Sequence, residues 1–368
     1  MVTSPIPNAE FSENGLLQLL IQALRELPNA NAQAHDAKLG HNAGQHDAEI
    51  ELSISGHPVR LLVEVKKAAF PRDVRQLLWQ IRQPNSLQVS GDPREETVPL
   101  LAAESISTGA RQLLREQGVG YFDTGGSLFV PARGAYVFID KPVPRALAKS
   151  VRSFFMGRRS QVLHAMLRSP HTWFGVKELA QRALVSPATA SETLAAMERF
   201  DWVTSRGQGP AKERCLTEPG ALLDAWARQT ETARAPAMRR YFLPAANAET
   251  LVDRVAAACK ASHAEYALTH EAAAQRYAAY ISHVSQVRCR LLSGSPADAA
   301  IAALNARTAN EGANFVVLEA KSLGEFLFRE SVDNVWLASP IQVYLDLLSG
   351  EGRGKEMAEH LRREKIGF

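Results

Sequence analysis

The stretch HDAEIELSISGHPVRLLVEVKK, residues 46–67, has the pattern of two β-strands joined by a tight turn. Apolar residues alternate with polar ones from Ile50 to Ile54, and apolar residues occupy every second position from Val59 to Val65. Ser-Gly-His-Pro at 55–58 supplies the turn. The stretch therefore predicts a β-hairpin, and this hairpin sets the fold class of the N-terminal part of the chain.

Helices and further strands are expected around this hairpin. Leucines on nearly every turn predict a helix over residues 14–28, and the polar residues 29–45 are expected to form a loop. After the hairpin, the pattern predicts an amphipathic helix, a strand, a second helix and two more strands, at 72–81, 98–102, 108–117, 119–123 and 127–130. This order of elements predicts a small α/β domain.

Three residues of the hairpin have the side chains of a metal-dependent nuclease site. Glu64 and Lys66 are two positions apart on one strand, so both leave the same face, and Asp47 begins the neighbouring strand. Two carboxylates with water suit Mg²⁺, and a lysine beside them can position or help to deprotonate an attacking water. The arrangement resembles the PD-(D/E)xK nuclease superfamily. That resemblance implies Asp47, Glu64 and Lys66 as catalytic residues, with Asp47 and Glu64 as metal ligands.

The acidic-x-lysine triplet does not by itself identify a nuclease. It occurs twice more in the chain, at 36–38 and 319–321, and His46 stands where the superfamily pattern has a proline. The alternative is an inactive copy of the nuclease-like fold, and we expect this alternative, with no cofactor bound. Mg²⁺ is expected only if the carboxylates are active. Asp123, before a Gly-Gly pair, is expected to form a turn.

Residues 151–217 form a basic block, with ten Lys and Arg against five Asp and Glu, which indicates an anionic polymer as partner. Two helices are expected at 160–170 and 173–183. A third follows, in which Ser186 is a suitable N-cap and Pro187 a suitable first helical residue. Its expected buried stripe consists of Leu194, Met197 and Phe200.

The outward face of this third helix is expected to enter the major groove of DNA, because its side chains are short and polar. After it, residues 203–217 predict two strands joined by a Gly-rich tip, a wing whose basic residues can meet phosphates. Arg158 and Arg159 lead into the first helix. The residues expected to contact DNA are Ser186, Ala188, Thr189, Ser191, Glu192 and Thr193 on the third helix, Arg206, Lys212 and Arg214 on the wing, and Arg158 and Arg159.

Together these elements predict a winged helix-turn-helix with double-stranded DNA as its partner. A winged helix used for protein contacts is the alternative, and the basic wing disfavours it. RNA is disfavoured because the block has few aromatic residues that could stack on bases.

Residues 218–368 alternate helices and strands, which predicts a second α/β domain compatible with a nucleotidyltransferase-like fold. Gly294-Ser295 is placed like a phosphate loop, but no Asp-x-Asp follows it to hold a metal, so an ordinary turn is expected there. The closing residues 350–365 are expected to form a basic, solvent-exposed helix.

Four segments resemble the AbiEi-type antitoxins of type IV toxin–antitoxin systems. They are RSQVLHAMLRSPHTWFGVKELAQRALVSPATASETLAAMERFDWV, LTEPGALLDAWARQ, YALTHEAAAQRYA and VWLASPIQVYLDLLSGEGRGKEMAEHL, and the resemblance is best over residues 152–368. It implies a repressor whose winged helix binds the promoter of its own operon. It also implies a C-terminal domain that opposes a nucleotidyltransferase-like toxin, generally without a stable complex. Larger members carry an additional N-terminal domain, as this chain does.

The chain as a whole is long enough for two or three domains, at 368 residues. Joints near 140–150 and 217 divide it into residues 1–145, 151–217 and 218–368. Neither a membrane-spanning apolar run nor a secretory signal is seen, and the three separated cysteines indicate reduced thiols in a cytoplasm. We expect a DNA-binding repressor of the antitoxin type, with a homodimer left open. The alternative is a metal-dependent nuclease targeted to DNA by its winged helix.

Overall fold

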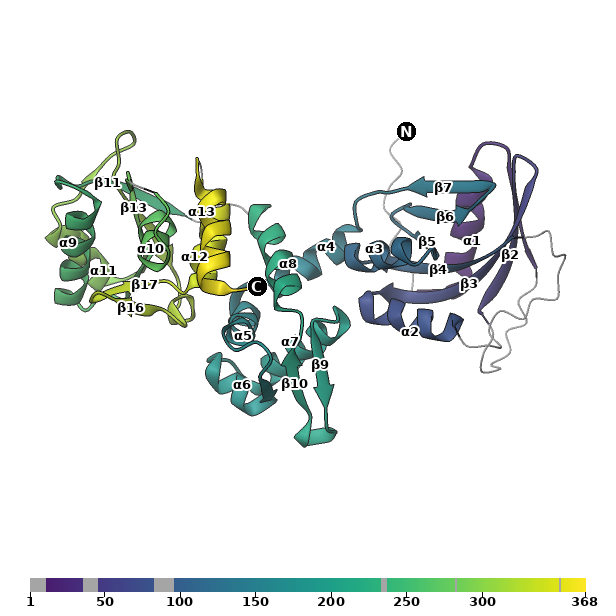
Figure 1. The fold of residues 1–368 in the computed structure, drawn as a ribbon, viewed down its shortest axis with the longest axis horizontal. Helices are drawn as coiled ribbons and strands as arrows, with labels where there is room; N and C mark the ends of the chain where they lie inside the picture. The colour runs from purple at the N-terminus through teal and green to yellow at the C-terminus, as the bar shows by residue number, and fades with distance from the viewer. Residues whose placement is uncertain (1–10, 36–45, 83–95, 233–236, 282, 351) are drawn as a thin grey trace. The chain divides into compact units, whose positions relative to one another are not determined.

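The computed structural model describes residues 11–35, 46–82, 96–232, 237–281, 283–350 and 352–368 (Figure 1). The chain divides into two compact units, residues 1–151 with 196–201, and residues 152–195 with 202–368. The expected joint near residue 217 lies inside the second unit. Within the described ranges, no helix is both long enough and apolar enough to cross a membrane.

The first unit is a mixed β-sheet with helices on both faces. Its elements are α1 (Glu13–Arg25), β1 (Ala30–His35), β2 (Ala48–Ile54), β3 (His57–Ala69), α2 (Pro71–Ile81), β4 (Glu96–Ile106), α3 (Thr108–Glu116), β5 (Gly120–Asp123), β6 (Leu128–Ala132) and β7 (Ala135–Ile139). The strands lie in chain order across the sheet; β3, β4 and β5 are parallel and the other neighbouring pairs are antiparallel. The predicted hairpin is confirmed, because β2 and β3 pair about a turn at Ser55 and Gly56, both with positive φ.

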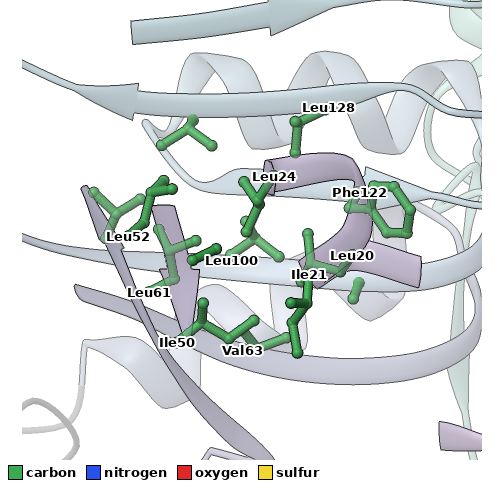
Figure 2. Close-up of a cluster of buried hydrophobic side chains, with 14 of the residues drawn as sticks. Leu20, Ile21, Leu24, Ile50, Leu52, Leu61, Val63, Leu100, Phe122 and Leu128 are labelled. Carbon is green, nitrogen blue, oxygen red and sulfur yellow. The ribbon is translucent and has the colours of Figure 1, made fainter. Parts of the chain in front are cut away.

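Both faces of this sheet are buried, as successive residues of β4 show. Leu100 belongs to one apolar cluster and Leu101 to another, because neighbouring side chains leave a strand on opposite faces. Figure 2 shows the first cluster, in which α1 packs against the sheet. Its labelled members are Leu20, Ile21, Leu24, Ile50, Leu52, Leu61, Val63, Leu100, Phe122 and Leu128. The second cluster lies under α2 and α3.

Two strands of the first unit are not predicted by the sequence. Residues 30–35 form β1, which pairs with β2 from Ala30↔Ile54 to His35↔Glu49, so the expected loop over 29–45 is wrong for this part. Of its side chains, that of Ala32 is fully buried. β7, at the opposite edge, pairs with β6. The remainder of the expected loop, 36–45, and the triplet at 36–38 lie outside the described residues.

Asp123 forms the expected turn and, in addition, a buried ion pair. Its Oδ1 accepts a hydrogen bond from the Gly125 backbone N–H at 2.9 Å, which confirms the turn. Its Oδ2 lies 2.5 Å from Nη2 of Arg111, and both side chains are almost completely buried. The same guanidinium donates through Nη1 to Asp140 at 2.8 Å and to the Lys141 carbonyl at 2.6 Å. The pair therefore ties α3 to the ends of β5 and β7.

The second unit begins with the basic block, apart from residues 196–201, which belong to the first unit. After α4 (Arg145–Phe154) come α5 (Gly157–Arg168), β8 (Trp173–Gly175), α6 (Val176–Arg182), α7 (Pro187–Arg199), β9 (Val203–Arg206), the short helix η1 (Gly209–Ala211) and β10 (Glu213–Leu216). The strands form a small antiparallel sheet in the order β8-β10-β9. The expected helices are present, and the expected strands of residues 203–217 pair with each other. β8 is an addition that the sequence pattern does not predict.

The rest of the second unit is a larger mixed sheet with helices on its faces. Its elements are α8 (Pro219–Glu231), β11 (Met238–Phe242), α9 (Ala248–Ala261), β12 (Tyr266–Thr269), α10 (His270–Tyr277), β13 (Val287–Leu292), α11 (Ser295–Ala303), β14 (Arg307–Thr308), β15 (Phe315–Ala320), η2 (Leu323–Phe326), β16 (Glu330–Val332), β17 (Val335–Leu337), α12 (Pro340–Leu348), α13 (Gly354–Leu361) and η3 (Arg362–Ile366). The strand order is β14-β11-β15-β13-β12-β17-β16. α9 packs against α11, and α10 packs against α12 and α13 (Figure 1). The predicted α/β architecture is confirmed, and the nucleotidyltransferase-like fold stays a prediction.

The expected basic, solvent-exposed helix is confirmed for one face of α13 only, because its other face is buried. Met357, Ala358 and Leu361 of α13 are buried. They recur at the spacing of one helical face, and α13 packs that face against α12 and α10. Arg362 follows, and its Nη1 lies 2.6 Å from Asp224 of α8.

One buried hydrogen bond joins the basic block to the larger sheet. Ser339 caps α12, since its Oγ accepts from the Gln342 backbone N–H at 3.2 Å. The same oxygen lies 2.6 Å from Nε2 of His164 in α5. Burial lowers the pKa of His164 to about 3, so its imidazole is neutral at neutral pH. The His164 ring also packs edge-on against Trp226 of α8.

Candidate nucleic-acid interface and carboxylate pair

The orientation of α7 follows from its cap and its buried stripe. The Oγ of Ser186 accepts from the Thr189 backbone N–H at 3.2 Å, so the predicted cap is confirmed. Leu194 and Met197 are fully buried, which fixes the rotation of the helix about its axis. Phe200, expected in the same stripe, is half-buried.

Four of the expected reading residues are exposed together at the start of α7. They are Ser186, Ala188, Ser191 and Glu192. Ala188, Ser191 and Glu192 follow the i, i+3, i+4 spacing, so they share one helical face. Small side chains at the first two positions let the backbone come close to a partner surface, as entry into a major groove requires.

Thr193 is not on this face, and the expectation that it points outward is wrong. Its side chain is 1% exposed, and its hydroxyl donates to the Thr189 carbonyl at 2.7 Å. The reason lies in helical spacing, because Ala190, Thr193, Leu194 and Met197 make one buried stripe at i, i+3, i+4 and i+7. Thr189 lies at the edge of the exposed face and is half-buried.

The wing is an antiparallel pair of strands, β9 and β10, joined through residues 207–212. Gly207 has φ +72°, and a Cβ there would meet the Ala211 carbonyl oxygen at 2.6 Å, so the turn requires glycine. Arg206 is exposed at the base of the tip. Its guanidinium pairs with Glu213 at 2.7 Å and lies 4.2 Å from the centre of the Trp173 ring. Lys212 is half-buried at the other end of the tip.

Arg214 does not lie at the tip of the wing, contrary to expectation. It is 8% exposed and sits in β10, the middle strand of the small sheet, opposite Phe174 of β8 and Ser205 of β9. The sequence gives no sign of β8 as a third strand, and that strand is what places Arg214 in the interior. Its expected contact with DNA phosphates is therefore not retained.

Further cations lie on the same block. Arg158 is exposed at the start of α5, and Arg159 lies 3.4 Å from Glu192 of α7, an exposed ion pair that holds Glu192 only weakly. The sequence pattern does not single out Lys177 and Arg182, yet both are exposed on α6. The excess of Lys and Arg over residues 151–217 is the sequence feature from which these two residues could have been predicted.

The carboxylates of the first unit lie as the hairpin predicts. Nζ of Lys66 is 2.7 Å from Oε1 of Glu64, so these two side chains share a face of β3. Asp47 reaches the same strand, where its Oδ2 accepts from the Val65 backbone N–H at 2.7 Å. Asp47 and Lys66 are exposed and Glu64 is half-buried. The structure therefore brings the three predicted residues together.

The electrostatics of Lys66 limit what it can do. Burial lowers its pKa, but the hydrogen bond to Glu64 and the charges of Glu64, Asp47 and Asp73 outweigh burial and leave that pKa raised. A protonated ammonium can hold the carboxylates or position a water, but it cannot take a proton from that water at neutral pH. Asp47 and Glu64 are the residues that would hold Mg²⁺, since two carboxylates with waters suit this ion. Among the described residues, those of the hairpin included, no group of three or more His, Cys, Asp and Glu side chains is arranged to hold a metal.

Comparison with known proteins gives one match. Residues 215–366 match the family described as "Transcriptional regulator, AbiEi antitoxin, Type IV TA system", which confirms the predicted resemblance for this part of the chain. No curated protein and no solved structure matches the chain. The matched region begins in β10, so α7, most of the wing and the first unit lie outside it.

Proposed function

We propose that the chain is a transcriptional regulator of the antitoxin type, and that residues 151–217 are a winged helix-turn-helix that binds operator DNA. The observation that carries this proposal is the exposed face of α7, with Ala188 and Ser191 free of large side chains, on a block that also exposes Arg206 and Arg158. Such a face fits a major groove, and the cations suit the flanking phosphates. The similarity of residues 215–366 to a regulator family supports the same function.

The proposed partners follow from that family. The DNA partner is an operator in the promoter of the chain's own operon, which the winged helix represses. The functional partner is a nucleotidyltransferase-like toxin, opposed without a stable complex. The α/β region after residue 217 is proposed to carry this second role, because the family match lies there.

The test is binding of the full chain to the DNA upstream of its own gene. We expect protection of a discrete site in a footprint, and an affinity for that fragment at least 1,000-fold above that for scrambled DNA of equal length, on the order of the specificity of known repressors. Equal affinity for the two fragments would contradict the proposal.

The wing contributes a measurable part of the salt dependence. Arg206→Ala and Lys212→Ala are each expected to weaken binding to all DNA sequences and to reduce the slope of log K against log salt by about one unit, because each releases a counterion when bound to a phosphate. Arg307→Ala is the charge-matched comparison, since Arg307 is exposed on β14 outside the basic block, and its slope is expected to be unchanged. An unchanged slope in the Arg206 and Lys212 variants would remove the wing from the interface.

A nuclease is the second candidate function, and the shared face of Glu64 and Lys66 beside Asp47 favours it. We expect no activity, because a cutter fused to an operator reader would endanger the promoter it regulates. The measurement is incubation of supercoiled and linear DNA with the protein in Mg²⁺ or Mn²⁺. Metal-dependent cleavage that disappears in both Asp47→Ala and Glu64→Ala would establish the nuclease instead. No cleavage, with both variants still repressing, leaves the hairpin as scaffold.

A further inference from the structure

A cavity of about 830 Å³ lies in the second unit, between α5 and one face of the larger sheet. Its floor consists of alternate residues from three neighbouring strands, β11, β15 and β13. Alternate residues of a strand point to one face, so these side chains project into the same space. The floor residues are Met238 and Arg240, Val316 and Leu318, and Arg288 and Arg290.

The strand register sets two arginines of the floor on either side of one valine. Arg240 pairs with Val316 across β11 and β15, and Val316 pairs with Arg288 across β15 and β13. Two strand spacings place the Cα atoms of Arg240 and Arg288 about 10 Å apart. Long guanidinium side chains at this separation can converge on one anion between them.

The arginines of the floor are unevenly paired with carboxylates. Arg290 is neutralised, since its guanidinium lies 2.6 Å from Asp346 of α12 and 3.4 Å from Glu325. Arg288 has a looser partner in Glu271, at 3.6 Å. In the part of the chain that the structure describes, no carboxylate lies within ion-pair distance of Arg240. The three arginines and the three carboxylates sum to zero, but the pairing is uneven, so Arg240 presents a guanidinium to the cavity without an ion-pair partner in the described ranges.

A buried histidine beside Arg288 lacks a hydrogen-bond partner. His270 lines the cavity and is 6% exposed, and its Nδ1 has no partner among the described residues. Gly350 lies against both groups, because a Cβ there would be 3.5 Å from Nη1 of Arg288 and 3.8 Å from Cδ2 of His270. Nδ1 lies on the other side of the ring from Cδ2 and is shielded from the cavity, so His270 forms part of the wall at this corner.

Part of the rim of the cavity is apolar, beside the exposed Arg158 and Ser322. Met156, Leu184 and Leu323 form this apolar part, and each is at least 60% exposed. Side chains of this kind in contact with solvent gather at binding sites, and the volume lies in the range of small-molecule sites, roughly 300–1,000 Å³. A charged floor beneath an apolar rim suits a ligand with an anionic end and an apolar or flat body.

We propose that this cavity binds a phosphate-bearing metabolite of mononucleotide size, with its phosphate between Arg240 and Arg288 and its body against the apolar rim. Phosphate suits two guanidinium groups on opposite sides, because its several oxygens can accept paired N–H donors from each of them.

The position of Leu184 gives this site a regulatory role, and this part rests on the proposed DNA binding. Leu184 lies in the turn between α6 and α7, with φ +52°, two residues before the cap of α7. A ligand that fills the cavity contacts this turn and the start of α5, so it bears on the elements that orient α7. The metabolite would then act as an effector of operator binding.

The test is calorimetric titration of the full chain with AMP, GMP, CMP and UMP, each compared with its nucleoside and with inorganic phosphate. We expect at least one monophosphate to bind ten or more times tighter than both comparison compounds. Arg240→Gln and Arg288→Gln should each weaken that binding at least tenfold. Arg307→Gln, an exposed arginine of β14 outside the cavity, is the matched control and should leave affinity within twofold.

Three outcomes would overturn the site. They are no monophosphate binding below millimolar concentration, affinity unchanged in both Arg240→Gln and Arg288→Gln, or inorganic phosphate binding as tightly as every monophosphate. Because Arg240 is exposed, its variant tests the site even if Arg288→Gln fails to fold. The regulatory part is tested separately, by a change of at least fivefold in operator affinity when the monophosphate is present. Ligand binding without operator binding would reject the proposed function and keep the site.

Discussion

Replacing Asp123 with alanine is expected to lower the free energy of unfolding of the first unit by about 3–5 kcal/mol. The change leaves the Arg111 guanidinium buried without its closest carboxylate, 2.5 Å away in the native chain. It also removes the acceptor that closes the turn at Gly125. The change is measured by hydrogen exchange with mass spectrometry on peptides from β4 to β6. The protection of these peptides reports the stability of the first unit alone, so unfolding of the second unit does not obscure the result.

Asp140→Ala is the matched control for this prediction. Asp140 pairs with the same guanidinium at 2.8 Å, but its side chain is 46% exposed. Water replaces such a partner, so the expected loss is at most about 1 kcal/mol. Equal protection factors in the Asp123 and Asp140 variants would show that burial does not set the strength of this ion pair.

The double variant Ala188→Glu with Ser191→Glu is expected to lose operator affinity by a factor on the order of 100 or more, about 3 kcal/mol. Two carboxylates on the exposed face of α7 would meet the negative field of DNA and fill the space that small side chains leave for base edges. The helix itself should remain stable, because acidic residues in the first turns interact favourably with its dipole. Fluorescence anisotropy with a labelled operator fragment measures the change.

Ala299→Glu with Ala302→Glu is the control for this variant. Both alanines are exposed on α11, outside the basic block, and they have the same i, i+3 spacing as Ala188 and Ser191. The change in net charge is the same in the two double variants. Operator affinity should stay within about twofold, because charges beyond a Debye length, about 8 Å in physiological salt, are largely screened. Equal losses in the two double variants would mean that net charge alone governs binding and that α7 does not enter the groove.

The sequence pattern predicts those helices and strands whose formation depends on residues close together in the chain. Alternation from Ile50 to Val65 predicted the hairpin, and Ser186 predicted the start of α7, because a strand face and a helix cap each depend on neighbouring residues. Strand β1 was missed for the opposite reason. Its residues are polar or small, and it is held by pairing with β2 across the edge of the sheet.

Burial of Arg214 depended on a partner that is distant in the chain, because β8 adds to the wing. Thr193 is buried for a local reason, since it follows Ala190 at the i, i+3 spacing of the buried stripe of α7. The cavity could not be predicted at all, since its floor needs the register of β11, β15 and β13. Pairs such as Arg290 with Asp346 join positions far apart in sequence, and no local spacing indicates them.

The hydrogen bond between Ser339 and His164 bears on how such chains can be recombined. A chimera that exchanges the proposed DNA-binding segment at residue 217 would pair α5 from one parent with α8 and α12 from another. Unless both parents keep a hydroxyl at the cap of α12 and an imidazole in α5, the exchange leaves a buried polar group without a partner. The segment that can be exchanged as a unit is therefore larger than residues 151–217, and it includes the first turn of a helix more than a hundred residues further along the chain.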